Sequence, residues 1–242
     1  MLNHKKIFAI LAIAVFLSAI PLVCAQSKPQ YVLVVNELRM DSNYAKPSGG
    51  GGGKPSGSVD YMLLGIKWSK AALPINLYVD GRVVDLDSGF VLDAVSQGTI
   101  EWDSYTRTTL VRTVTTSSTP LEAETDKPDF INEVVFGPIS DPYVIAVTNT
   151  WYNSLTKQIV EFDITFSTSF TWGDGTFDNT IMDLQNIATH ELGHGFGLAD
   201  LYNDESPTQP LQTMYGLADF GETMKRSLES GDIAGIRAIY GR

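Results

Sequence analysis

The chain has 242 residues, which is long enough for a leader segment and one folded domain with its own core. Hydrophobic residues make up 43% and charged residues 19%, a balance that excludes a disordered chain. The formal net charge is −11, and because such a chain repels phosphate backbones and has no basic patch, we exclude nucleic acid as a partner.

Residues 1–25 have the pattern of a secretory signal peptide. Lys5 and Lys6 form a basic start, residues 7–20 are almost entirely apolar, and residues 23–25 (Val-Cys-Ala) end in a small residue. The apolar run is short for a membrane-spanning helix. We therefore predict a secreted, extracellular protein with no stable membrane span after cleavage, and a membrane-anchored one if the signal is retained.

Cleavage of this leader changes the chemistry available to the mature chain. It removes the sole cysteine, Cys24, so no disulfide can form. It also removes His4, which leaves His190 and His194 as the only histidines. The leader contains two lysines and no acids, so the net charge moves from −11 to −13.

A short N-terminal piece precedes the main domain. Tyr31–Val35 reads as a buried strand, and residues 46–58 hold five consecutive glycines between two Lys-Pro-Ser units, the composition of a flexible linker. We divide the chain into an N-terminal strand or propeptide with its linker (26–58) and a domain at 59–242.

Strands and helices alternate within the domain. The expected strands are Ile75–Val79, Val144–Thr148 and Ile159–Phe166, and the last should have one buried face because apolar and acidic residues alternate. Helices are expected over residues 90–102 with Ser88 as N-cap, over 180–195, and after Ser230. This order predicts an α+β domain in which the helix at 180–195 packs under a twisted sheet.

The segment from His190 to Asp200 carries the clearest chemical signal. Residues four apart on a helix share a face, so His190 and His194 can direct both imidazoles at one point, a geometry suited to Zn²⁺. Glu191 follows His190 and is turned about 100° from it around the helix axis. Its carboxylate would therefore reach a metal-bound water and act as the general base.

A catalytic zinc site needs a third protein ligand and an open fourth position. Gly197 can adopt a positive φ and end the helix in a tight turn, which would bring Asp200 back over the metal. We therefore expect His190, His194 and Asp200 to bind the metal, with Glu191 as the catalytic residue.

The segment HELGHGFGLAD resembles the metzincin signature HExxHxxGxxD, with aspartate in place of the usual final histidine, as in the snapalysin variant. Further segments resemble matrixins, at residues 67–68, 161–166, 184–190 and 232–241. The resemblance covers roughly residues 61–242. It implies a zincin domain with a twisted mixed sheet over the active-site helix and a short C-terminal subdomain ending in a helix.

The same resemblance implies a methionine turn beneath the metal. Thr213-Met-Tyr-Gly matches that turn and makes Met214 its methionine, with Met224 as the rival. Tyr215 would either hydrogen-bond the reacting oxyanion or pack. Matrixins are often held latent by a propeptide cysteine, which the mature chain lacks, so Glu37 or Asp41 would have to block the metal if residues 26–58 are a propeptide.

These observations predict a secreted zinc-dependent endopeptidase that hydrolyses protein or peptide substrates through a zinc-bound water. From the matrixin resemblance, we expect the substrate to lie along an edge strand at Ile164–Ser169. One alternative is a non-catalytic, zinc-stabilised extracellular module, and another is a gluzincin-type peptidase with Glu222 or Glu229 as the final ligand.

Whether the protein binds a second metal remains open at this point. Asp174 and Asp178 lie in a glycine-rich loop with the spacing of oxygen ligands, which suits Ca²⁺ as well as a solvated acidic turn. The sequence implies no oligomer.

Overall fold

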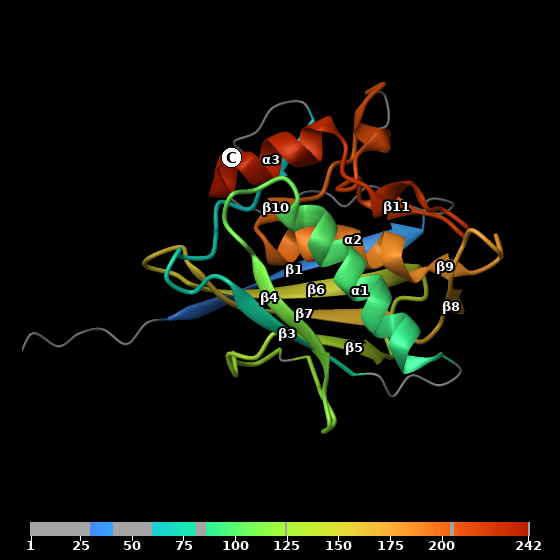
Figure 1. The fold of residues 1–242 in the computed structure, drawn as a ribbon, viewed down its shortest axis with the longest axis horizontal. Helices are drawn as coiled ribbons and strands as arrows, with labels where there is room; N and C mark the ends of the chain where they lie inside the picture. Colours follow the sequence, from blue (N-terminus) through green and yellow to red (C-terminus); the bar gives the residue numbers. More distant parts are fainter. Residues whose placement is uncertain (1–29, 41–59, 81–85, 124, 204–205, 242) are drawn as a thin grey trace, which may run out of the picture.

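The structure is a computed structural model that describes residues 30–40, 60–80, 86–123, 125–203 and 206–241. These residues form one large sheet with two helices on one face and a third helix near the C-terminal end (Figure 1). The predicted α+β class, with a twisted mixed sheet, is confirmed. The expected signal peptide and glycine-rich linker lie outside the described residues. Within the described part of the chain, no helix combines the length and apolar character needed to cross a membrane.

The elements alternate along the chain. The strands are β1 (Tyr31–Met40), β2 (Met62–Leu63), β3 (Ile75–Val79), β4 (Val111–Thr116), β5 (Glu133–Gly137), β6 (Val144–Asn153), β7 (Ile159–Ser167), β8 (Trp172–Gly173), β9 (Met182–Asp183), β10 (Leu198–Ala199) and β11 (Leu217–Ala218). The helices are α1 (Ser88–Asp103), α2 (Leu184–Gly195) and α3 (Ser230–Tyr240), with 3₁₀ turns η2 (Gln209–Leu211) and η3 (Met224–Arg226). Strands β4 and β5 and the two-residue strands β2, β8, β9, β10 and β11 were not expected from the sequence.

The large sheet has the order β11-β1-β6-β7-β5-β3-β4. Strands β7, β5, β3 and β4 run parallel, whereas β6 is antiparallel to both β7 and β1. Strand β7 therefore lies inside the sheet, where Ile164 pairs with Thr148 on one side and Val134 on the other. The expectation that Ile164–Ser169 forms a substrate-binding edge is wrong, because β5 and β6 already occupy both of its edges.

Strand β7 is buried on both faces, not on one as predicted. Its apolar residues enter the core, but Glu161 and Asp163 are only 0% and 1% exposed. Backbone groups before and at the start of β5 bind one oxygen of each, since the N–H of Phe130 donates to Glu161 and that of Glu133 donates to Asp163 at 3.1 Å. The alternation of apolar and acidic residues in β7 does not reveal whether another segment covers its outer face.

Helix α1 packs against α2. Asp87 caps α1 by accepting from the Phe90 N–H at 3.0 Å, so the predicted cap, Ser88, is instead the first helical residue. At the other end of α1, the indole Nε1 of Trp102 donates to the Thr189 carbonyl of α2 at 2.7 Å. This bond joins the two helices beneath the sheet.

Helix α3 holds the end of α2 in place, which confirms a short C-terminal part that ends in a helix. The Tyr240 hydroxyl donates to the Phe196 carbonyl at 3.0 Å and accepts from the Trp68 N–H at 3.2 Å. The Trp68 indole in turn donates to the Gly195 carbonyl at 2.9 Å. Three distant parts of the chain thus meet where α2 ends.

Candidate metal centre

Helix α2 presents both histidines of the motif on one face. It begins at Leu184 and not near Thr180, because β9 pairs with β8 immediately before it and Asp183 caps the helix through the Asn186 N–H at 2.8 Å. His190 and His194 lie one turn apart, and their Nε2 atoms are 3.1 Å from each other.

The chain reverses at Gly197, as predicted. Its φ of 100° is strained for any residue with a side chain, and a Cβ would lie 2.4 Å from the Ile66 carbonyl oxygen. Glycine is therefore required twice, for conformation and for space. After the turn, β10 pairs antiparallel with β2 and leads the chain to Asp200.

The three predicted ligands converge. Asp200 Oδ1 lies 3.2 Å from His190 Nε2 and 3.3 Å from His194 Nε2. Both imidazoles are fully buried, the Asp200 side chain is 9% exposed, and no hydrogen-bond donor among the described residues reaches Oδ1. Within the described residues, this is the only group of histidines, cysteines and acids with metal-site geometry.

Backbone carbonyls fix the tautomer of each histidine. His190 Nδ1 lies 2.7 Å from the Thr213 carbonyl, and His194 Nδ1 lies 2.9 Å from the Leu198 carbonyl. A carbonyl oxygen only accepts, so each Nδ1 carries hydrogen and each neutral ring presents an Nε2 lone pair to the centre. Two nitrogen lone pairs and an unsatisfied carboxylate oxygen form a donor set that fits Zn²⁺.

A metal ion and a proton would compete for the same donor atoms. Burial alone would lower the pKa of His194, but the Asp200 carboxylate raises it to about 9. Burial likewise opposes ionisation of Asp200, yet the two histidines hold its pKa well below the usual range. Protonation of either side chain would remove a metal donor, so acid should weaken metal affinity.

Glu191 lies beside this cluster and is fully buried. Its Oε2 accepts a hydrogen bond from the hydroxyl of Thr148 on β6, whereas its Oε1 is buried without a partner among the described residues. Burial raises the pKa of Glu191, although the neighbouring histidines oppose that shift. One oxygen of the carboxylate is thus held and the other is available.

Met214, not its rival Met224, lies against the motif helix. A Cβ on Gly193 would come within 2.2 Å of Met214 Sδ, whereas Met224 is 42% exposed on η3. Asp232 of α3 holds this turn by accepting from the N–H groups of Thr213 at 2.7 Å and Met214 at 3.0 Å. This role of Asp232 was not predicted, although an acid in the first turn of a helix is a recognisable capping signal.

Two tyrosines lie near Asp200. The Tyr202 hydroxyl donates to Asp200 Oδ2 at 3.0 Å and so orients the carboxylate, a contact that no sequence motif indicated. Tyr215 is 9% exposed and follows Met214 directly. Its contact with a reacting oxyanion stays a prediction.

The rival acidic residues are engaged elsewhere. Glu222 pairs with the buried Lys225, and Glu229 caps α3, so the gluzincin alternative is not supported. Glu37 pairs with Arg39 at 2.8 Å, and its side chain is 47% exposed. It therefore does not block the metal cluster, and Asp41 lies outside the described residues.

The structure gives the calcium hypothesis no support. Arg226 bonds the Asp174 carboxylate at 2.6 Å and also pairs with Asp183. The Asp178 carboxylate accepts from the Thr180 N–H at 2.8 Å. A guanidinium thus supplies the positive charge that a calcium ion would bring to Asp174.

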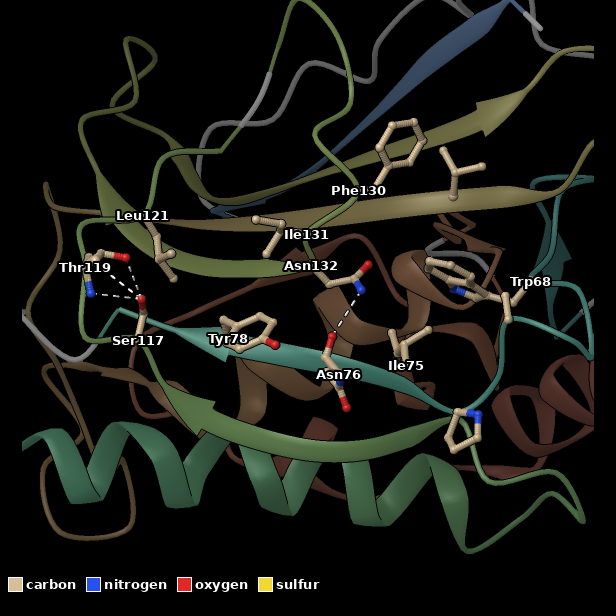
Figure 2. A pocket seen from close by; sticks show the side chains of 13 residues that line it. Trp68, Ile75, Asn76, Tyr78, Ser117, Thr119, Leu121, Phe130, Ile131 and Asn132 are labelled. Carbon is tan, nitrogen blue, oxygen red and sulfur yellow. Dashed lines mark hydrogen bonds between the residues drawn. The ribbon is translucent and has the colours of Figure 1, made fainter.

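A hollow of about 510 Å³ lies away from the cluster, between β3 and the segment that leads into β5 (Figure 2). Asn132 and Asn76 both line the hollow, and Nδ2 of Asn132 donates to the Asn76 carbonyl at 3.1 Å. None of the predicted site residues lines it, so it contributes nothing to the metal chemistry.

Comparison with known proteins agrees with this geometry. The family model of the matrixins, peptidase family M10, matches residues 66–241. No curated protein matches the chain. The matched range contains the whole metal cluster and α3, and it excludes β1.

Proposed function

The chain belongs to the matrixin family of zinc metallopeptidases, and on that premise we propose that it is a secreted endopeptidase in which Glu191 is the general base. His190, His194 and Asp200 would hold the zinc, and protein or peptide chains would be the substrates. The pattern of residues 1–25 supports secretion.

One observation carries this proposal. Three acceptor atoms, on two tautomer-fixed histidines and one aspartate, converge beside a buried glutamate that has one unpartnered oxygen. A site built only for stability has no need of a general base and closes its fourth position with another ligand. Glu191 is therefore the residue that distinguishes a catalytic zinc site from a structural one.

The residues divide the chemistry between them. Bound zinc would supply a Lewis acid that polarises the scissile carbonyl and acidifies water. Glu191 would take the proton from the attacking water through Oε1 and deliver it to the departing amine. Tyr202 would keep Asp200 oriented toward the histidines. No covalent enzyme intermediate is needed.

Burial differs among the candidate site residues. His190, Glu191 and His194 are fully buried, whereas the Asp200 side chain is 9% exposed. The same burial suits the alternative of a zinc-stabilised module without activity, and this alternative needs its own test.

The test combines metal content with proteolysis. The wild-type protein should contain zinc and cleave casein, and a chelator should abolish cleavage. Glu191→Ala should keep the zinc and the melting temperature but lose activity about 10²–10⁴-fold, because only proton transfer is removed. Zinc without cleavage in the wild type would favour the structural module, and near-normal turnover by Glu191→Ala would refute the mechanism.

A further inference from the structure

We infer that Thr148 is a positioning residue for Glu191: its hydroxyl holds one carboxylate oxygen so that the other is presented to the attacking water. The inference rests on the proposed function, since it assumes that Glu191 is the base. It assigns a role in the reaction to a residue outside the metal motif.

The contact joins the sheet to the motif helix. Thr148 is fully buried on β6, and its Oγ1 donates to Glu191 Oε2 and lies 3.2 Å from the Glu191 carbonyl oxygen. Among the described residues, Thr148 is the hydrogen-bond partner of Oε2, and Oε1 has no partner. The orientation of the base therefore depends on a single hydroxyl.

Such a hydroxyl has a large effect because no other hydrogen bond from the described residues fixes the direction of the carboxylate. The last torsion of a glutamate is broad and roughly two-fold, so an unheld carboxylate samples many orientations. Threonine is stiff at χ1, and Thr148 is fixed further by strand partners on both sides, Asn36 on β1 and Ile164 on β7. A rigid donor pre-organises the base, and misplacement by about 1 Å can cost about 10²-fold in rate.

The same strand provides a matched control. Thr150 lies two residues further along β6, so its side chain points to the same face of the sheet. It is also fully buried, yet its Oγ1 has no hydrogen-bond partner among the described residues. The two threonines share residue type, strand and burial, and they differ in the contact with Glu191.

The experiment compares Thr148→Val, Thr148→Ser and Thr150→Val in the full zinc-loaded protein. The values of kcat and KM are measured on one quenched fluorogenic peptide that the wild type cleaves, well below each variant's melting temperature. Zinc affinity is measured separately by competition with a chromophoric chelator. If Thr148→Val does not fold, Thr148→Ala replaces it, because a smaller side chain cannot clash.

We expect Thr148→Val to lower kcat at least about tenfold, with KM and zinc affinity within about twofold of wild type. Thr148→Ser should restore most of the loss, because it restores the donor, and Thr150→Val should change kcat less than about twofold. Equal kcat values for Thr148→Val and Thr150→Val, a loss that follows zinc affinity, or no rescue by serine would overturn the inference. Failure of the proposed function would give other results. The wild type would then show no chelator-sensitive cleavage, or Glu191→Ala would cleave the peptide as fast as the wild type.

Discussion

Helix α2 and strand β1 both flank β6, but they contribute differently to the protein. Helix α2 is almost wholly buried, lies inside the residues that match the matrixin family, and carries His190, Glu191 and His194. Strand β1 lies outside the matched residues and is largely half-buried or exposed, with Leu38 and Met40 entering the core. The comparison separates an element that carries the proposed active-site residues from one that completes a sheet. Changes in α2 should therefore affect zinc binding and activity, whereas changes in β1 should affect stability.

The largest effect is expected at the ligand that follows α2. Asp200→Ala removes one of three donors, so zinc content should fall to near zero and casein cleavage at least about 10³-fold. Asp200→His restores a metal-binding side chain and should retain zinc. Measurement of zinc per chain and of cleavage checks both variants. Retention of zinc by Asp200→Ala would mean that another residue completes the site.

A smaller effect is expected from the residue that supports the methionine turn. Asp232→Asn replaces one of the two oxygens that accept from Thr213 and Met214, and Thr213 in turn orients His190. Zinc affinity should fall about 10–100-fold, as is typical for outer-shell partners of metal ligands. Chelator competition measures it. Unchanged affinity would show that the turn holds its place without α3.

Removal of β1 should lower stability and leave the chemistry in place. A chain that begins at Asp60 loses Leu38 and Met40 from the core, so its melting temperature should fall by at least about 5 °C relative to a chain that begins at Gln26. Zinc content should stay the same. Unchanged melting together with higher activity would instead identify residues 26–58 as a propeptide.

A further effect concerns the outer face of the sheet, where Tyr31 of β1 packs against Phe130. Burial raises the pKa of Glu161 to about 7 from its ordinary 4.5, although the Phe130 N–H opposes the shift. A carboxyl group that holds its proton more tightly when folded costs nothing well below pH 4.5 and destabilises the protein as pH rises toward 7.

Glu161→Gln removes that ionisation and keeps an oxygen for the Phe130 N–H. Its stability advantage over the wild type should therefore grow by about 2–3 kcal/mol between pH 5 and pH 8. Chemical denaturation at both pH values measures the difference. An advantage that does not change with pH would contradict the shifted pKa.

The convergence of the three candidate metal ligands was predictable because its geometry is local. Helical spacing aligns His190 with His194, and the turn at Gly197 brings Asp200 to them within a few residues. Thr148 and Asp232 were not predicted, since each makes a contact that only tertiary packing creates. Tyr202 lies two residues from Asp200, but no motif indicated their hydrogen bond.

The order of the strands in the sheet was not predicted, for the same reason. The pairing of β7 with β5 on one side and β6 on the other is non-local, so its sequence could not reveal that it lies inside the sheet. Strand β4 is exposed over most of its length and shows no apolar alternation, which left it unrecognised. Strand β1 was expected only to Val35, because its second half mixes polar and apolar residues and is a strand through its pairing with β6.

The contact between Asp232 and the methionine turn also bears on biosynthesis. A nascent chain synthesised as far as Tyr215 already carries His190, His194 and Asp200, but it lacks the Asp232 carboxylate that holds Thr213 and Met214. We expect the centre to mature only after α3 has left the ribosome, so the producing cell would be shielded from proteolysis while the chain is translated. Chains that end before Ser230 should accordingly retain little zinc, and full retention would disprove this timing.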